Sequence, residues 1–175
     1  MSEIIMKEII IKSQKEFDEL DTSTKAIINI DFGDKDNPAK INKNFPKGLI
    51  YIIDTYANIY SPAVSVHAYG NSYIKAYNDI LVFAYDETTV EAHHNAHVIS
   101  IITDDVKIIL HDESRVFVTC TSKNVVIDAY GSSFVEVAEQ SIATINIKSR
   151  YVRCKICEGF SGQLTGYTPV GYICS

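Results

Sequence analysis

The sequence predicts an all-β fold, a parallel β-helix (β-solenoid), and three observations lead to this prediction. First, the stretch from Ala63 to Ile147 repeats about every eight residues. Second, side chains within each repeat alternate with period two, the pattern of a half-buried strand rather than a helix. Third, residues that suit tight corners separate the strands. The corner pairs are Gly70-Asn71, Asn78-Asp79, Asp86-Glu87, His94-Asn95 and Gly131-Ser132.

Each octad supplies one strand and one corner. Branched apolar residues are expected to point inward at Val66, Ile74, Val82, Val90, Val98 and Val106, with small residues two positions later. One octad cannot bury its apolar face alone, whereas stacked octads share a continuous core. An antiparallel sandwich or a hairpin meander usually needs longer strands than this repeat allows. The sequence does not choose between two and three octads per coil. We expect three, about 24 residues, wound right-handed as parallel crossovers prefer.

The repeat loses its phase after Val106. The next clear strands are 116–120 and 125–129, so the spacing grows before it returns to eight near Val135. We therefore expect His111-Asp112-Glu113-Ser114 to form a longer corner loop. It is either an insertion accommodated at the surface or a recognition loop.

The first part, residues 1–47, is expected to form a small N-terminal cap and loop. Residues 4–12 and 26–33 have strand-like patterns. Ser13 and Glu16 between them match a capping box that opens a short helix. A strand–helix–strand unit could cover the open end of the solenoid, which would otherwise expose core and unpaired backbone. The polar segment 34–47 is expected to be a loop with one short strand at 39–41.

The other two parts are the repeat array itself, 48–150, and the segment 151–175. The last segment begins with one more strand, in which Val152, Cys154 and Ile156 alternate. The remainder is glycine-rich and has no clear period, so we expect either a closing cap or a tail that orders on a partner.

Charge and hydropathy exclude several classes of partner. The 175 residues carry a formal net charge of −6, which disfavours direct binding to nucleic-acid phosphate or to an anionic membrane. No run of 18 apolar residues predicts a membrane span. The start of the chain lacks the features of a secretory signal, so we expect a cytoplasmic protein whose four cysteines are reduced thiols.

Candidate catalytic and metal motifs are weak, and we predict no enzyme activity, no cofactor and no metal. Cys154-Lys155-Ile156-Cys157 lacks a second ligand pair, and Cys154 fits an inward core position. His93, His94 and His97 form H-H-x-x-H, but a corner is expected between them. Carboxylates gather at Asp104, Asp105, Asp112 and Glu113, beside His111 and Arg115, where an acid–base pair could form. We interpret them as corner residues that face water.

The binding residues we predict are aromatic and point outward. They should form a surface ladder, stacked from coil to coil, in which His93 takes the place held by tyrosines in preceding octads. Large aromatic side chains suit a covered face, although they also simply favour strands. The predicted ladder comprises Tyr69, Tyr77, Tyr85, His93, Phe83 and Tyr130.

The octads AYGNSYIK, AYNDILVF and AYDETTVE resemble the A-x-G-N-A-x-V-x repeat arrays of β-helix proteins from bacteria, phages and mobile elements. The resemblance covers about half of the chain. It implies the architecture but no activity, because most of these proteins are uncharacterised and function resides in sites rather than folds. Some proteins of that setting inhibit host-defence systems.

The sequence therefore favours a non-enzymatic protein-interaction module, acting in assembly or as an inhibitor through a solenoid face or end. The expected partner is a protein, which can be a second copy in a homodimer. One alternative is a β-helix that binds or cleaves carbohydrate. Another is an acidic mimic of nucleic acid, which would need carboxylates aligned along one side.

Overall fold

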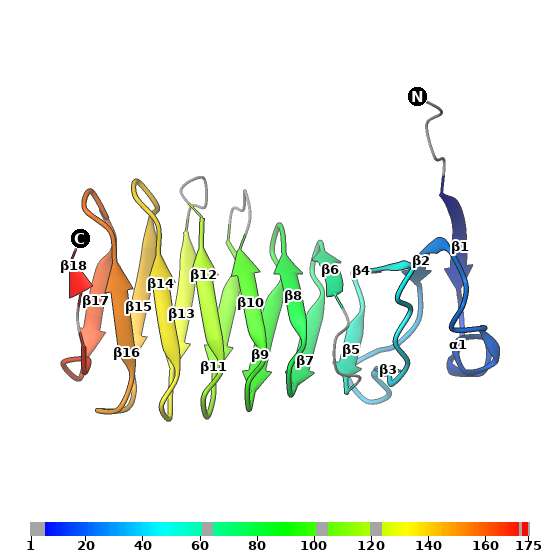
Figure 1. The fold of residues 1–175 in the computed structure, drawn as a ribbon, viewed down its shortest axis with the longest axis horizontal. Helices are drawn as coiled ribbons and strands as arrows, with labels where there is room; N and C mark the ends of the chain where they lie inside the picture. Colours follow the sequence, from blue (N-terminus) through cyan, green and yellow to red (C-terminus); the bar gives the residue numbers. More distant parts are fainter. Residues whose placement is uncertain (1–5, 61–64, 101–104, 120–123, 172, 175) are drawn as a thin grey trace.

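The computed structural model describes residues 6–60, 65–100, 105–119, 124–171 and 173–174. It is a parallel β-solenoid in which two sheets lie along one long axis (Figure 1). From β2 onward, strands alternate between the sheets along the chain, so each turn contributes one strand to each sheet. The fold class predicted from the octads is confirmed.

Sheet A contains β1 and the even-numbered strands. In order, these are β1 (Lys7–Ile11), β2 (Ala26–Ile30), β4 (Leu49–Ile53), β6 (Ser65–Tyr69), β8 (Leu81–Ala84), β10 (His97–Ser100), β12 (Arg115–Val118), β14 (Phe134–Val137), β16 (Arg153–Ile156) and β18 (Ile173–Cys174). Sheet B contains the other odd-numbered strands. These are β3 (Ala39–Ile41), β5 (Tyr56–Ile59), β7 (Tyr73–Tyr77), β9 (Thr89–His93), β11 (Lys107–Leu110), β13 (Val125–Ala129), β15 (Ala143–Ile147) and β17 (Gln163–Gly166).

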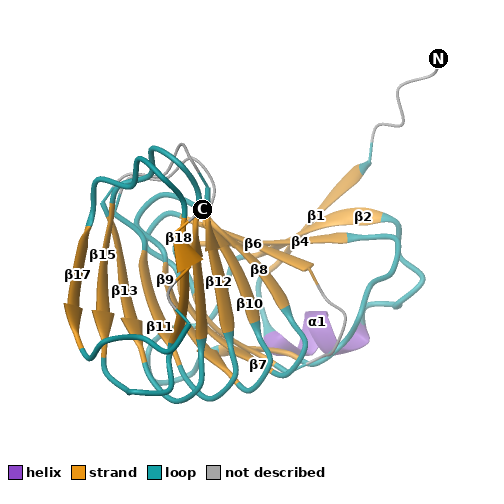
Figure 2. Ribbon diagram, turned by 60° about the vertical axis from the view of Figure 1, so that its left-hand side comes forward, coloured by secondary structure: helices purple, strands orange, loops and turns teal. Residues whose placement is uncertain are grey.

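The expectation of three octads per coil is wrong. A turn has two strands and about 18 residues (Figure 2). Val66 pairs with Val82 and Val82 with Val98 in sheet A, whereas Ile74 pairs with Val90 in sheet B. Like residues therefore stack over every second octad. Successive octads face each other across the core, because each corner sends the chain back along the other sheet.

The interior is mostly apolar along the described stack. Inward side chains of both sheets have no solvent exposure, as in Val66 and Val82 of sheet A and Ile74 and Val90 of sheet B. The small residues expected beside the corners also stack, as in Ala76 over Ala92. This arrangement gives one continuous core in place of separate clusters, as the repeat predicts.

Left-handed backbone angles form the corners. Gly70, Asn78, Asp86, His94 and Gly131 have φ between 53° and 66°, and each is the first residue of a predicted corner pair. Polar hydroxyls close some corners from inside: Ser72 Oγ donates to Tyr69 O at 2.6 Å at the Gly70 corner, and Ser114 Oγ donates to His111 O at 2.6 Å at the corner where Asp112 has a φ of 55°. Gly, Asn and Asp suit these positions because they tolerate a positive φ.

The register corrects the position of the phase change. Ile108, not Val106, pairs with Val90, and Arg115 pairs with His97. The corner at His111–Ser114 is thus as long as the one before β10, and the expectation of a bulging loop there is wrong. Seven positions separate Ser100 from Lys107, against five from Ala84 to Thr89. The extra length lies before β11, in a stretch that includes residues outside the described part.

The N-terminal strand–helix–strand is confirmed. Ser13 caps α1 (Gln14–Glu19) by accepting the Glu16 N–H at 3.3 Å, and Glu16 Oε2 accepts the Lys12 N–H at 2.8 Å. Phe17, on this helix, is fully buried and packs edge-on against Phe45 with ring centroids 5.7 Å apart. Both flanking strands belong to sheet A, so the stack already includes residues assigned above to a separate cap.

The C-terminal segment continues the stack. β17 pairs in parallel with β15 in sheet B, and β18 with β16 in sheet A. The sequence showed one more strand after residue 150, whereas the structure has three in the described part of that segment. Short strands with exposed side chains, as in β17, leave little periodicity to detect.

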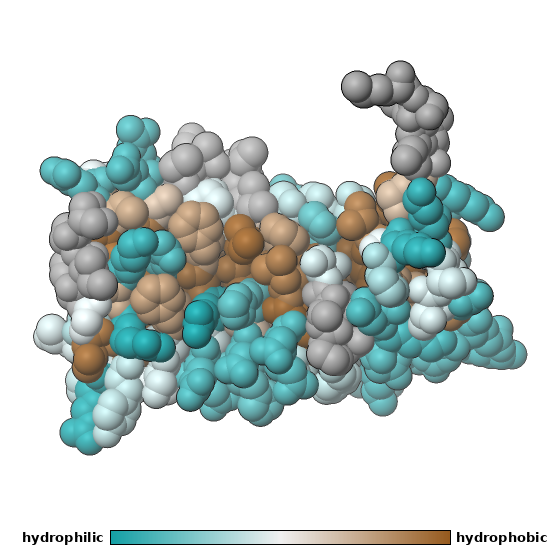
Figure 3. Space-filling model, in the orientation of Figure 1, coloured by the Kyte–Doolittle hydropathy of each residue, from teal (hydrophilic) through white to brown (hydrophobic). Residues whose placement is uncertain are grey.

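The outer faces of the two sheets differ. Sheet A carries a band of large apolar side chains across its middle strands (Figure 3). The central outward column of sheet B is mixed and polar: Asn58, Lys75, Glu91, Ile109, Asp128 and Asn146 lie over one another. Among the described residues, no helix has the length and apolar character of a membrane span.

Candidate functional site

The six predicted binding residues are divided between two surfaces. Tyr77, His93 and Tyr130 lie at the C-terminal ends of strands in sheet B. Tyr69, Phe83 and Tyr85 lie on sheet A. The expectation of one ladder is wrong because successive octads belong to opposite sheets. Stacking itself is present: the Tyr69 and Tyr85 rings lie 4.3 Å apart, and Phe83 stacks on His67 at 4.7 Å.

The sheet B ladder contains two residues outside the predicted set, Tyr60 and His111. Its rings follow the order Tyr60, Tyr77, His93, His111 and Tyr130, with centroids 5.0, 4.9, 4.5 and 5.3 Å apart. The His93 and His111 rings are nearly parallel, at 4°. A signal for this column was present, because an aromatic ring follows the second inward residue of every other octad.

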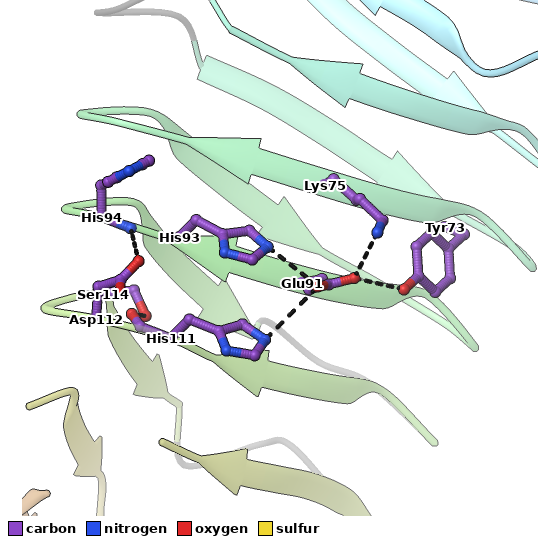
Figure 4. Close-up of polar contacts among 8 residues, drawn as sticks. All are labelled: Tyr73, Lys75, Glu91, His93, His94, His111, Asp112 and Ser114. Atoms are coloured by element: carbon purple, nitrogen blue, oxygen red, sulfur yellow. Dashed lines mark hydrogen bonds and ion pairs between the residues drawn. The ribbon is translucent and has the colours of Figure 1, made fainter. Parts of the chain in front are cut away.

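Glu91, in the middle of β9, is the centre of a polar cluster on this face (Figure 4). Its Oε2 accepts a hydrogen bond from the Tyr73 hydroxyl at 2.7 Å and lies 3.1 Å from Lys75 Nζ. Its Oε1 lies 3.1 Å from His93 Nε2 and 3.6 Å from His111 Nε2. Strand pairing places these groups together, since Lys75 lies over Glu91 and His93 follows two positions later on the same face.

Neighbouring groups shift the ionisation of this cluster. Burial opposes the charge of Glu91, but hydrogen bonds from Tyr73 and Lys75 outweigh it and lower the pKa of this carboxyl. Burial, with the bond to Glu91, raises the pKa of Tyr73 to about 12. Burial, followed by the proximity of His111, lowers the pKa of His93. At neutral pH the cluster therefore holds a carboxylate beside a neutral imidazole.

These shifts predict that acid destabilises the fold. The folded chain binds protons at His93 and Glu91 less readily than the unfolded chain, so this stability is present at neutral pH. It is lost first as the pH falls below 6.5, the ordinary pKa of His, and further below 4.5, that of Glu. Urea unfolding between about pH 8 and pH 5 should show falling stability, with a weaker fall in His93→Gln. An equal fall in both proteins would contradict this assignment.

A pocket of about 570 Å³ adjoins the cluster on sheet B. Tyr56, Tyr73 and Tyr77 line it together with Lys35 and Lys75. The Tyr56 and Tyr73 rings stack on each other at 5.6 Å and 20°, so each ring covers one face of the other.

The H-H-x-x-H histidines do not converge. His93 is outward on sheet B, His94 forms the corner with φ 56°, and His97 begins β10 of sheet A. The prediction that a corner separates them is confirmed. Glu91, His93 and His111 come together in their place, with one possible ligand atom from each lying within 4.8 Å of the others.

The carboxylates considered for catalysis are spread over corners. Asp105 and Asp112 both have positive φ and are exposed, and Asp112 Oδ2 accepts the backbone N–H of His94 at 3.1 Å. Glu113 is exposed in the same corner as Asp112, and Arg115 starts β12 on the other sheet. Asp104 lies outside the described residues.

Cys154 occupies the inward core position predicted for it. It pairs with Val135 and is fully buried, and this burial raises the pKa of its thiol to about 11. Cys157 lies beyond the end of β16 and is half-buried. Cys120 and the side chain of Cys174 lie outside the described residues. The cysteines that the structure describes are therefore Cys154 and Cys157, the two of the C-x-x-C motif.

Comparison of the chain with protein-family models, with curated proteins and with solved structures finds no match in any of the three.

Proposed function

We propose that this solenoid is a non-enzymatic protein-interaction module that binds a second copy of itself through the outer face of sheet A. The observation that supports the proposal is the apolar band on that face (Figure 3). Surface bands of large apolar side chains are uncommon on proteins whose faces all meet water. The band consists of Leu81, Phe83, Ile99, Phe117 and Phe134. His97 and Arg115 lie between Leu81 and Phe134 in one outward column and border the apolar column of Phe83, Ile99 and Phe117.

The composition of this face matches an interface centre with a polar rim. Phe117, the most exposed of the band, has 37% of its surface exposed. Towards the C-terminal end the band gives way to charge: Arg153 lies over the Phe134 ring at 5.8 Å, and Lys155 pairs with Glu136 at 2.8 Å. An apolar centre bordered by charged groups is the usual arrangement of protein interfaces.

A second copy is the partner that fits this face most simply. A two-fold axis parallel to the strands would set the apolar band against itself, as required for an isologous dimer. Two sheets packed in this way lie about 10 Å apart and interdigitate their side chains. In this proposal the chain acts in assembly or as an inhibitor of its partner.

The two alternative functions have less support. Beside the sheet B pocket, the Tyr56 and Tyr73 rings cover one face of each other, which reduces the ring surface that a sugar could pack against. The central outward column of sheet B mixes Lys75 with Glu91 and Asp128, so carboxylates are not aligned as a nucleic-acid mimic would need.

The proposal predicts that Phe117→Lys abolishes dimerisation, because it places a charge at the centre of the buried band. Light scattering over a range of concentrations should give a dimer mass for the wild type and a monomer mass for this variant. Val126→Lys is the matched control, since Val126 is 36% exposed and points outward from a strand of sheet B. That variant should remain dimeric. A wild-type monomer at every concentration would overturn the proposal.

A further inference from the structure

Three side chains on sheet B form a cluster that the sequence did not reveal. Glu91 and His93 belong to β9, and His111 follows β11, the next strand of the sheet. One oxygen of Glu91 and one ring nitrogen from each histidine lie within 4.8 Å of one another. Figure 4 shows both imidazole rings directed towards the same carboxylate.

We propose that Glu91, His93 and His111 bind a divalent transition-metal ion of the zinc class. Two imidazole nitrogens and one carboxylate oxygen are a donor set that such ions favour over Mg²⁺ or Ca²⁺, which prefer oxygen alone. Oε1 lies 3.1 Å from His93 Nε2 and 3.6 Å from His111 Nε2. Separations of that size suit ligands that each lie about 2.0–2.2 Å from a shared ion.

The carboxylate is already oriented for this role. Tyr73 and Lys75 hold Oε2 at 2.7 and 3.1 Å, which leaves Oε1 directed at the two rings. Outer partners of this kind commonly fix a metal-binding carboxylate. The side chains of Glu91, His93 and His111 are 16%, 21% and 32% exposed, so solvent can reach the cluster and supply a fourth ligand.

Two features of the cluster lower the affinity for the metal ion without preventing it from binding. The histidine rings lie almost parallel, so at least one must tilt out of the stack for both Nε2 lone pairs to meet one ion. The ammonium of Lys75 adds a positive charge beside the same carboxylate. Lys75 bonds the oxygen that faces away from the rings, and the ion would therefore occupy the opposite side.

The test is titration of the whole chain with Zn²⁺ by calorimetry, and with Co²⁺ by visible absorption, because the visible band of Co²⁺ becomes more intense when the ion leaves six-coordinate water for a four-coordinate protein site. The wild type should bind one Zn²⁺ per chain and give a Co²⁺ band. His111→Ala and Glu91→Gln should each weaken Zn²⁺ binding at least about tenfold and abolish the Co²⁺ band. Circular dichroism of each variant confirms that the fold is intact.

Two histidines provide matched controls. His94 adjoins the cluster in sequence but points away from Glu91 in Figure 4, and His97 lies on sheet A. His94→Ala and His97→Ala should bind Zn²⁺ like the wild type. Binding that is unchanged in His111→Ala, or that is lost equally in His94→Ala, would overturn the site. Phe117→Lys should also bind Zn²⁺ normally, because the ion site and the proposed dimer face lie on opposite sheets.

Discussion

Replacing Ile127 by Ala is expected to lower the free energy of unfolding by about 2–5 kcal/mol. Ile127 has no solvent exposure and lies between Ile108 and Ile145 in the inward column of sheet B. The lost methyl groups leave a cavity that the stack cannot close, because hydrogen-bonded strands on both sides fix the spacing of the turns. Urea unfolding followed by circular dichroism measures the loss.

The adjacent residue provides the control for this substitution. Val126 points outward from the same strand and is 36% exposed, so Val126→Ala should cost no more than about 1 kcal/mol. The two variants differ by one position along the chain and by the face that they occupy. A cost at Val126 as large as at Ile127 would mean that the assignment of inward and outward residues is wrong.

The second large effect is expected at a corner. Gly131→Ala should destabilise the fold by about 1–3 kcal/mol, since it combines an unfavourable φ with a close contact. The φ of Gly131 is +61°, and a Cβ there would lie 2.8 Å from the Asp112 backbone nitrogen and 2.9 Å from its carbonyl oxygen. Asp86 and His94 tolerate similar φ values at other corners, so the contact with the turn before is what requires glycine here.

Gly159→Ala separates the two contributions. Gly159 also has a positive φ, +84°, but a Cβ there would meet nothing within 4 Å. This variant should lose only the conformational part, about 1–2 kcal/mol, and should remain more stable than Gly131→Ala when thermal unfolding of the two is compared. If Gly159→Ala proved the less stable, contact between successive corners would not be the reason for glycine at position 131.

The strands and corners could be predicted because they depend on local chemistry. Alternation gives Ile74 and Val90 their inward direction, and the corner residues adopt the left-handed angles for which their types are suited. The number of strands per turn is not local. It depends on the angle through which each corner turns the chain. The octad repeat gives the length of each strand and corner but not the angle between one strand and the next.

That single error explains what was missed at the candidate site. With two strands per turn, His93 stacks on His111, 18 positions later, and not on a residue of the neighbouring octad. The extra residues between Ser100 and Lys107 hide this spacing in the sequence. Glu91 was overlooked for the same reason, because its contacts with Lys75 and His111 come from the turns before and after it.

The most direct test of the two-stranded turn uses paired cysteine substitutions on the surface. Val126 and Thr144 are register partners in adjacent strands of sheet B, whereas Val126 and Phe134, eight positions apart, belong to different sheets. Under mild oxidation, peptide mapping should find a disulfide in Val126→Cys/Thr144→Cys, because register partners lie within bridging distance. No such bond should form in Val126→Cys/Phe134→Cys. The opposite result would contradict the stacking of every second octad on which the account depends.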